Sequence, residues 1–262
     1  MTHAEREAAL EAVATEVRGC TKCRLHQTRT LAVPGEGSPD TEVVFVGEGP
    51  GFNEDKQGRP FVGRAGDLLT KFLATLRWKR QEVFITNIVK CRPPDNRDPE
   101  PDEIAACAPY LKRQLEILDP ALVVTLGRHS LGRFMPGERI SQAHGTLRSV
   151  DPATGAGSAM AFALYHPAAA LRTPDIERTS YADVAQIPAA LLEARARRTA
   201  THETQPAAAQ SFGATTPSTA PVDGPARTAT AVAVMATIDD AARPSPATAD
   251  ALTDIEPDFT LF

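Results

Sequence analysis

The feature that most constrains the fold is a regular alternation of short apolar runs with amphipathic, helix-like segments. Four runs of strand length, EVVFVG, EVFITNI, ALVVTLG and MAFALYH, begin at residues 42, 82, 121 and 160. Apolar side chains recur at helical spacing in residues 4–20, 65–76, 100–118 and 181–198. Strands that alternate with helices are typical of a parallel sheet covered on both faces. The sequence therefore predicts the α/β class, as a three-layer α/β/α sandwich with a mainly parallel central sheet.

Polar turns follow each of the four predicted strands. They are Gly47-Glu48-Gly49-Pro50-Gly51, Asn87 in TNIVKCRPP, Gly127-Arg128-His129 and Tyr165-His166-Pro167. In open α/β sheets, ligands bind outside the carboxyl ends of the strands. We therefore expect these turns to converge on one rim that forms a binding site.

Three side chains near this rim suit a planar heterocycle with an amide-like edge. Phe61 offers a stacking face, Asn87 an amide that donates and accepts, and His166 a hydrogen-bond donor to a developing anion. Each residue alone has a simpler explanation. An Asn after a strand is often a turn former, a Phe a core residue, a His before Pro a cap, and Glu48 a solvated acid. The combination is what points to a site.

The composition changes near residue 203. From there the chain is rich in Ala, Thr, Pro and acidic residues, with no period on which a core could be built. The sequence predicts a folded domain over residues 1–200 and a disordered acidic tail over residues 201–262. Residues 203–262 carry a net charge of −6, so the total of −5 leaves the rest at +1. A near-neutral body binds a polyanion when its basic residues gather on one face.

No apolar run approaches the roughly 20 residues that a membrane span needs, and no signal-peptide pattern opens the chain. We expect a cytoplasmic monomer without a membrane partner.

The four cysteines form a C-x2-C pair, Cys20 and Cys23, with two distant singles, Cys91 and Cys107. Because the cytosol keeps thiols reduced, metal ligation is a better interpretation than two disulfides. A structural zinc and an iron–sulfur cluster use the same four thiolates, and the spacing does not separate them. Cys107 also lies on an apolar helical stripe, where a cysteine is often a small core residue.

Several motifs together resemble those of the family-4 uracil-DNA glycosylases, bacterial and archaeal enzymes with a [4Fe–4S] cluster. The motifs are GEGPG, GRPFVGRAG, TNIVKCRPPDNRDP and HPAAALR, with the four cysteines in the same order. The resemblance covers about residues 10–197. It implies one structural [4Fe–4S] cluster on Cys20, Cys23, Cys91 and Cys107, and excision of uracil from DNA by hydrolysis of the N-glycosidic bond, which leaves an abasic site for base excision repair.

The resemblance also assigns roles at the rim. The turn with Gly47 and Gly49 would cradle a flipped-out uracil, Phe61 would stack on its ring, and Asn87 would read its Watson–Crick edge. His166 would stabilise uracil O2 as negative charge develops there, and Glu48 would position the attacking water or the sugar cation. In the best-known uracil glycosylases the water-activating carboxylate stands one place later, where this chain has Gly49. Whether Glu48 is the base or only orients the water is left open by the sequence.

Four residues are expected to contact DNA. Leu171 would fill the space that the flipped base leaves, and Arg172 would meet phosphate, although AAAL alone also fits the start of a helix. Arg92 and Arg97, in the loop after Cys91, suggest that the cluster braces a DNA-contacting loop.

Two other classes of protein share some of these sequence features. An iron–sulfur oxidoreductase would need a second cofactor site, and neither G-x-G-x-x-G after a strand nor a flavin motif is present. A non-catalytic zinc-bound nucleic-acid module would explain the cysteines but leave Glu48, Asn87 and His166 without a role. The loop after Cys91 also has no histidine of the kind with which a sister group cross-links itself to the abasic sugar, so turnover is expected.

The last residues, DFTLF, follow some fifty residues with no core-forming pattern. They resemble the QLSLF-like peptides by which bacterial repair and replication proteins bind the sliding clamp, although Asp258 stands where glutamine is usual. A short apolar peptide on a long tether is a typical docking motif. The sliding clamp, another partner and a merely solvated end are the alternatives.

Overall fold

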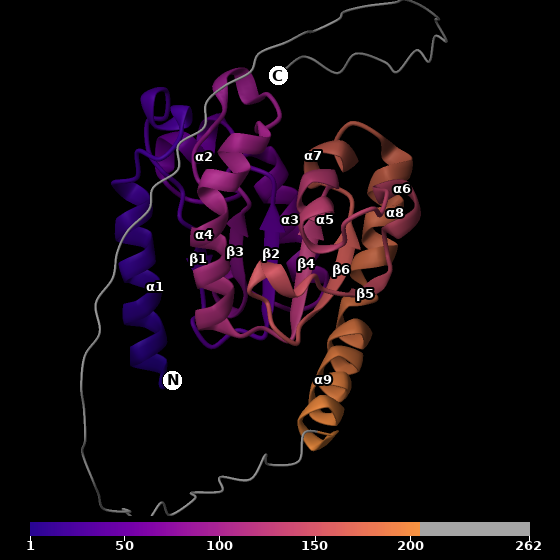
Figure 1. Cartoon of the computed structure of the whole chain (residues 1–262). Helices are drawn as coiled ribbons and strands as arrows, with labels where there is room; N and C mark the ends of the chain where they lie inside the picture. The colour runs from indigo at the N-terminus through magenta and orange to yellow at the C-terminus, as the bar shows by residue number, and fades with distance from the viewer. Residues whose placement is uncertain (205–262) are drawn as a thin grey trace, which may run out of the picture. The chain divides into compact units, whose positions relative to one another are not determined.

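The computed structural model describes residues 1–204. They form three layers, with one six-stranded sheet between two layers of helices (Figure 1). The strand order is β1-β3-β2-β4-β6-β5. The strands are β1 (Glu36–Gly37), β2 (Val43–Gly47), β3 (Phe84–Asn87), β4 (Leu122–Leu126), β5 (Leu147–Ser149) and β6 (Met160–Leu164). The four central strands are parallel, and the two short edge strands are antiparallel to their neighbours. The predicted α/β class with a mainly parallel sheet is confirmed.

Helices cover both faces of the sheet. The α-helices are α1 (His3–Arg18), α2 (Phe52–Gln57), α3 (Arg64–Thr75), α4 (Pro101–Leu118), α5 (Arg128–Phe134), α6 (Ile140–Ala143), α7 (Pro167–Ala170), α8 (Pro174–Val184) and α9 (Ile187–Thr204). Short 3₁₀ turns are η1 (Arg24–Gln27), η2 (Arg80–Glu82), η3 (Pro94–Asn96) and η4 (Pro152–Thr154). Helices α1, α4 and α5 share one apolar core with the sheet, and α3, α8 and α9 share the other.

Each central strand contributes to both cores, because successive side chains of a strand point to opposite faces. In β2, Val44 and Val46 belong to the core under α1 and α4, whereas Val43 and Phe45 belong to the core under α3. A strand buried on both faces is apolar throughout, which is why these runs were recognisable in the sequence.

Local capping explains where two of the helices begin. Thr2 and Glu5 form a capping box at the start of α1, with the Thr2 hydroxyl accepting from the Glu5 amide and the Glu5 carboxylate accepting from the Thr2 amide. Helix α4 begins at Pro101, whose missing N–H is not needed in a first turn, and the Glu103 carboxylate accepts from the Glu100 amide. Both helices therefore start where the sequence provides partners for free backbone amides.

One predicted helix was wrong in its extent. Residues 181–198 were expected to form a single helix, but α8 ends at Val184 and α9 begins at Ile187. Pro188 has no amide hydrogen, and its ring would clash with the carbonyl of Val184 in a continuous helix. The chain therefore breaks and starts again with Pro188 in the first turn of α9. The edge strands β1 and β5 had no counterpart in the prediction, because two or three residues are too few to show a period.

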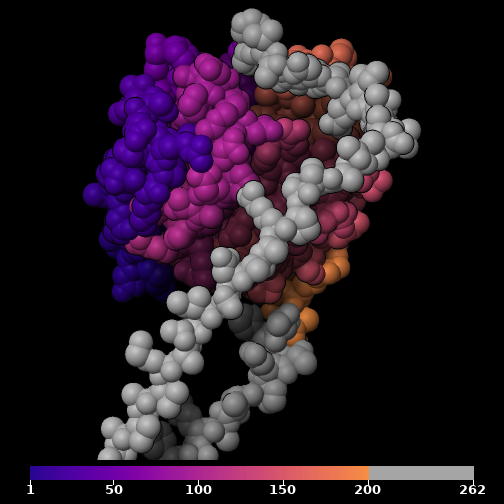
Figure 2. Space-filling model, turned by 45° about the horizontal axis from the view of Figure 1, so that its top comes forward, coloured from indigo at the N-terminus to yellow at the C-terminus, as the bar shows by residue number. Residues whose placement is uncertain are grey.

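Helices α2 and α7 lie near the same end of the sheet, and α9 extends away from the opposite end (Figure 1). Figure 2 turns the first of these ends toward the viewer and shows amino-terminal segments beside segments from the middle of the chain. In the part of the chain that is described, no helix is both long and apolar enough to cross a membrane. The predicted tail and its DFTLF end lie outside the described residues, apart from the last turn of α9.

Candidate active site and cysteine pocket

The ends of β2 and β3 bring three of the predicted site residues together. Gly47, the last residue of β2, is paired in register with Asn87, the last residue of β3. A Cβ atom on residue 47 would lie 2.5 Å from Asn87 Oδ1 and 2.5 Å from Phe61 Cζ. Only glycine therefore allows the Phe61 ring and the Asn87 amide to come this close to the strand end. Gly49, in the same turn, has a similar role against Val89, whose Cγ2 would lie 2.8 Å from a Cβ at residue 49.

The backbone at Phe61 is held in an unusual conformation by Glu54, a residue that sequence reasoning missed. Phe61 has a φ of 51°, in the left-handed region that is uncommon for a bulky residue. Glu54 Oε1 accepts hydrogen bonds from the amides of Val62 at 2.8 Å and Gly63 at 2.9 Å. Gly66, in α3, packs directly against the Phe61 carbonyl, where a Cβ would overlap it. The Glu54 carboxylate, which comes from α2, and the close approach of Gly66 in α3 thus fix the loop of residues 58–63, here called the Phe61 loop.

The Asn87 side chain is buried and unpaired. It is 1% exposed, and neither Nδ2 nor Oδ1 has a hydrogen-bond partner among the described residues. A buried amide without partners costs free energy, so such a group is retained where a ligand supplies the missing bonds. The Asn87 amide therefore offers one donor and one acceptor to a molecule at this rim.

His166 caps α7 in a way that defines its tautomer. Its Nδ1 accepts from the Ala168 amide at 3.1 Å, so the proton of a neutral ring is on Nε2. Burial, together with smaller contributions from the nearby charges of Arg172 and His129, lowers the pKa of His166 to about 4. The ring centroid is 5.8 Å from that of Phe61. His166 is therefore a neutral hydrogen-bond donor that follows β6 and lies near the Phe61 ring.

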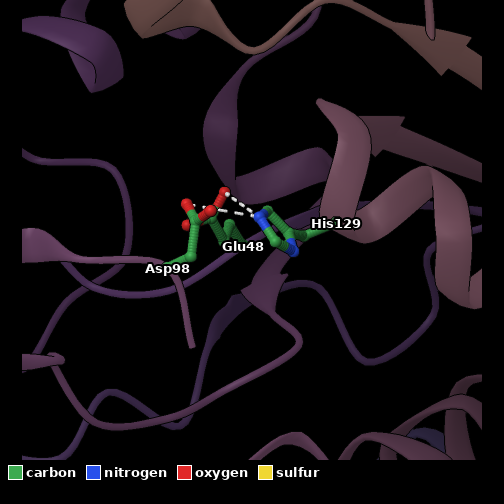
Figure 3. A group of neighbouring side chains, drawn as sticks. All are labelled: Glu48, Asp98 and His129. Carbon is green, nitrogen blue, oxygen red and sulfur yellow. Dashed lines mark ion pairs between the residues drawn. The ribbon is translucent and has the colours of Figure 1, made fainter. Parts of the chain in front are cut away.

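Glu48 lies beside two further titratable residues, His129 and Asp98 (Figure 3). His129 Nε2 is 3.8 Å from Glu48 Oε2 and 3.3 Å from Asp98 Oδ1. Burial raises the pKa of the Glu48 carboxyl, His129 opposes this shift and Asp98 adds to it. Asp98 is also paired with Arg128. The sequence placed His129 on the rim without a role, and it gave no signal for Asp98, which is fifty residues from Glu48.

A buried lysine lies behind the strand end. Lys90 is 1% exposed, and its Nζ donates to Thr86 Oγ1 at 2.5 Å, to the Asn87 carbonyl at 2.8 Å and to Gln114 Oε1 at 2.7 Å. Burial lowers the pKa of Lys90 to about 8, and the Cys107 thiolate opposes this shift. Its partners place the ammonium on the α4 side of the sheet, whereas the Asn87 side chain is on the Phe61 side.

The four cysteines line one pocket between α1, η1 and α4. Cys91 and Cys107 are buried, Cys20 and Cys23 are partly exposed, and none is in a disulfide. Among the described residues, no three cysteine Sγ atoms lie within 4.8 Å of one another. A tetrahedral zinc with Zn–S bonds of about 2.3 Å would need S···S distances of about 3.8 Å. The spacing of the four sulfurs in the structure therefore does not by itself distinguish a zinc ion from a larger cluster.

Hydrogen-bond donors and positive charge surround these sulfurs. Arg29 Nη1 donates to Cys91 Sγ at 2.9 Å, and the Lys90 amide donates to Cys107 Sγ at 3.2 Å. Burial raises the pKa of the Cys91 thiol, and Arg29 opposes this shift. Burial also raises the pKa of the Cys107 thiol, to about 11, although Lys90 opposes the shift. Without a metal these buried thiols would stay protonated, whereas the two cations would compensate thiolates that ligate a metal. The donor set thus fits a negatively charged metal–thiolate group.

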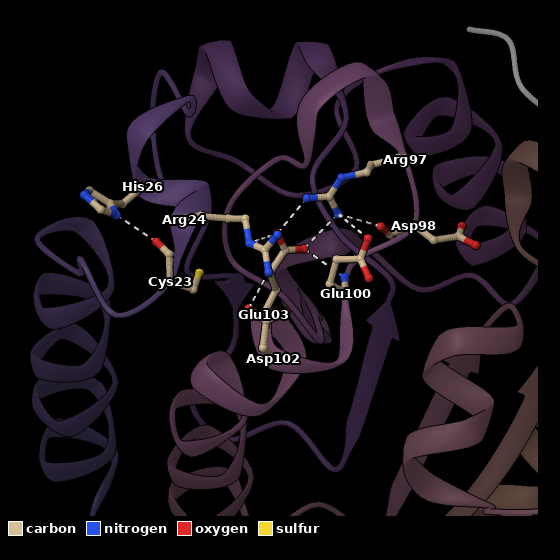
Figure 4. Close-up of polar contacts among 8 residues, drawn as sticks. All are labelled: Cys23, Arg24, His26, Arg97, Asp98, Glu100, Asp102 and Glu103. Atoms are coloured by element: carbon tan, nitrogen blue, oxygen red, sulfur yellow. Dashed lines mark hydrogen bonds and ion pairs between the residues drawn. The ribbon is translucent and has the colours of Figure 1, made fainter. Parts of the chain in front are cut away.

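Ion pairs connect the cysteine pocket to the loop after Cys91 (Figure 4). Arg97 makes a bidentate pair with the buried Glu103, with distances of 2.9 and 2.6 Å. Arg24, next to Cys23, pairs with Asp102 at 2.7 Å. The first turn of α4 therefore links the C-x2-C segment to the loop. The Arg97 guanidinium faces Glu103 here, and its contact with DNA remains a prediction.

The other residues predicted to contact DNA are accessible. Leu171 follows α7 and is 37% exposed, and Arg172 beside it is exposed. Arg92 is partly buried, and its Nε donates to Asn96 Oδ1 at 2.7 Å. Leu171 and Arg172 thus follow His166 closely, and Arg92 follows Cys91, so the three lie next to the site and the cysteine pocket.

Comparison with known proteins agrees with this geometry. The family model of the uracil DNA glycosylase superfamily matches residues 34–187, so the fold and the site define a member of that superfamily. The type-4 uracil-DNA glycosylase of Sulfurisphaera tokodaii is 49% identical over 190 residues, which are 68% of this chain and 83% of the relative. That of Thermotoga maritima is 47% identical over 64% of this chain and 85% of the relative. This chain belongs to the type-4 uracil-DNA glycosylases, as its motifs predicted.

A relative from another type is more distant. The type-5 uracil-DNA glycosylase of Thermus thermophilus is 36% identical over 38% of this chain and 52% of the relative. The sequence identity to the type-4 proteins is thus higher, and it covers more of both chains.

Proposed function

We propose that this protein hydrolyses the N-glycosidic bond of deoxyuridine in DNA and leaves an abasic site for base excision repair. The observation that carries the proposal is the buried, unpaired amide of Asn87 beside the Phe61 ring. A flipped uracil has a flat ring to stack on Phe61 and, at its edge, the N3–H donor and O4 acceptor that an amide complements. The type-4 uracil-DNA glycosylases that this chain resembles are named for this activity.

Selection of uracil over cytosine follows from the same amide. Cytosine presents an amino group where uracil presents O4, so the Asn87 amide held in the uracil-binding orientation would face a donor with a donor. A polar mismatch in a closed site leaves buried groups unpaired and discriminates strongly. Gly47 and Gly49 let the base approach the backbone of the turn, and Phe61 supplies the stacking surface.

Bond cleavage places negative charge on the departing uracil and positive charge on the sugar. His166, neutral and protonated on Nε2, donates a hydrogen bond to uracil O2 as the charge grows. The Glu48 carboxylate stabilises the sugar cation and orients the attacking water. Because its pKa is raised, it is also a better proton acceptor than an exposed glutamate. His129 lies close enough to Glu48 to restrain it.

The reaction is monofunctional in this account. Lys90 follows the uracil-reading strand end by three residues, and its ammonium is buried on the α4 side with three neutral acceptors. Its amine therefore does not reach the sugar to form a Schiff base.

We further propose that Cys20, Cys23, Cys91 and Cys107 hold one [4Fe–4S] cluster with a structural role. The hydrogen bonds to sulfur and the two nearby cations support a metal–thiolate group, and the similarity to the type-4 uracil-DNA glycosylases favours a cluster over zinc. The group would tie the end of α1 to the loop after β3 and to α4. Visible absorption and iron content of the purified protein test this assignment, and stoichiometric zinc without iron would contradict it.

For DNA, we propose that Leu171 fills the space of the flipped base while Arg172 and Arg92 meet phosphates. Arg97 contributes mainly by fixing the loop through Glu103. Residues 1–200 would act as a monomeric glycosylase domain in the cytoplasm, and residues 201–262 as a disordered tail.

The sliding clamp is proposed as a partner of the terminal DFTLF, with Leu261 and Phe262 entering an apolar pocket. Binding of the terminal nonapeptide to the clamp, with both residues replaced by alanine as the control, is the test. Absence of binding at tens of micromolar, or equal binding by the control, would end this proposal.

A further inference from the structure

Phe52 is an exposed aromatic residue next to the candidate active site. It is the first residue of α2, it directly follows the turn of residues 47–51, and it is 51% exposed. Two cations lie against its ring, with Lys56 Nζ at 4.2 Å and Arg92 Cζ at 5.3 Å from the ring centroid. An accessible ring between two cations is the combination that single-stranded nucleic acid favours, because bases stack and phosphates need positive charge.

The rest of α2 is fixed, so this ring has a rigid support. Glu54 holds the amides of Val62 and Gly63. Asp55 is buried, with its side chain accepting from the Thr30 amide at 2.9 Å and its carbonyl from the Leu31 amide at 3.0 Å. Phe52 and Lys56, four residues apart, share the remaining outward face of the helix. The exposure of Phe52 is therefore set by the packing of α2 and not by a loose helix.

The ring is also close to the path that the DNA strand must take. The turn that would cradle uracil ends one residue before Phe52. Arg92 belongs to the loop after β3, and that loop packs against the same turn, since a Cβ at Gly49 would lie 2.8 Å from Val89 Cγ2 and 3.8 Å from Pro93 Cδ. Turn, ring and cation thus form one continuous surface beside Glu48.

We infer that Phe52, Lys56 and Arg92 bind the nucleotide next to the flipped uracil in an unpaired strand. The neighbouring base stacks on the Phe52 ring, and the Lys56 ammonium, which makes no ion pair among the described residues, moves from the ring to a phosphate. This inference rests on the proposed function and adds a second base-binding position to it. It gives the enzyme a grip on single strands that does not depend on which base is present, because every base has a π face.

The test combines changes in the protein with removal of single bases from the DNA. Binding of single-stranded oligonucleotides without uracil is measured by fluorescence anisotropy for the wild type, Phe52→Ala, Phe52→Leu and Phe52→Trp. In parallel oligonucleotides that do contain uracil, a tetrahydrofuran residue replaces the base at each of the two positions on either side of it. Leu192→Ala is the matched control, since Leu192 is 63% exposed and lies on α9.

We expect Phe52→Ala and Phe52→Leu to weaken single-strand binding about tenfold, and Phe52→Trp and Leu192→Ala to leave it within twofold. Excision by Phe52→Ala should show a higher KM with an unchanged kcat, because the contact is made equally in the ground and transition states. At one flanking position, loss of the base should weaken wild-type binding about tenfold and leave binding by Phe52→Ala unchanged.

Equal effects of base removal on the wild type and on Phe52→Ala at all four positions would overturn the inference. So would undiminished single-strand binding by Phe52→Ala. A wild type that excises uracil while Phe52→Ala behaves identically would refute only this inference. A wild type that binds strands but excises nothing would refute the proposed function, and the base-removal series would still decide the role of Phe52.

Discussion

Replacement of Glu54 by alanine should lower the kcat/KM of uracil excision, although Glu54 is not among the residues proposed to contact the substrate. The change removes the acceptor of two backbone hydrogen bonds, from Val62 and Gly63, that hold the Phe61 loop. Hydrogen bonds to a charged group contribute about 1.5–3 kcal/mol each. Since Glu54 is partly exposed, we take about 2 kcal/mol for the pair, after discounting for solvent screening. The left-handed backbone of Phe61 adds to the tendency of the loop to relax, because such conformations are strained for bulky residues.

Uracil binding would then have to order the loop, so kcat/KM should fall by about 30-fold, which is what 2 kcal/mol corresponds to. The assay is single-turnover excision on a uracil oligonucleotide, with a thermal melt to show that the global fold is retained. Glu54→Gln keeps an oxygen in the accepting position and should lose less than tenfold. Wild-type excision by Glu54→Ala would refute the reasoning, as would equal losses in both variants.

Four further predictions concern base selection, the cluster and, in two cases, the dependence on pH. Asn87→Asp should lower uracil excision and allow slow cytosine excision, because a carboxyl oxygen accepts from the cytosine amino group; full uracil activity in an excision assay would remove Asn87 from the reading role. Cys91→Ala should lose iron and melt several degrees lower, because the ligands close long loops; unchanged iron content and melting would show that Cys91 is no ligand. The pKa of His166 is lowered to about 4, so the folded state resists protonation that the unfolded chain accepts near pH 6.5, and stability is lost as the pH falls from 6.5 toward 4. His166→Asn should therefore lose less stability than the wild type between pH 7 and pH 5 in urea titrations, and an equal loss would contradict the depressed pKa. The acid limb of kcat/KM should follow Glu48 and lie at higher pH than an ordinary glutamate would give, because the pKa of Glu48 is raised by burial, and Glu48→Gln should abolish that limb.

The elements that the sequence predicted best were those with a strong local pattern. The run at residues 43–47 is buried on both faces and therefore apolar throughout. The strand ends were also foreseeable, because a parallel sheet brings the carboxyl ends of its strands to one edge. This is why Gly47 and Asn87, forty residues apart, could be expected to meet, and they are paired in register.

What could not be predicted depends on contacts between distant residues that leave no periodic trace. Glu54 reads as an ordinary helix acid until the Phe61 loop is folded onto it. Asp98 belongs to a proline-rich loop, and only the fold brings it beside His129. Lys90 carries a charge that would ordinarily be expected on the surface, yet its side chain is buried. In each case the decisive partner lies in another element of the chain.

The measurement that tests the central claim most directly is alkali cleavage of a uracil-containing oligonucleotide after incubation with the purified, iron-loaded protein. The oligonucleotide carries one uracil, as a single strand and opposite guanine, and a thymine-containing copy is the control. We expect a single product broken at the uracil position, much less of it with Asn87→Ala and with His166→Ala, and no cleavage of the control. An intact uracil strand after incubation with wild-type protein of full iron content would contradict this expectation.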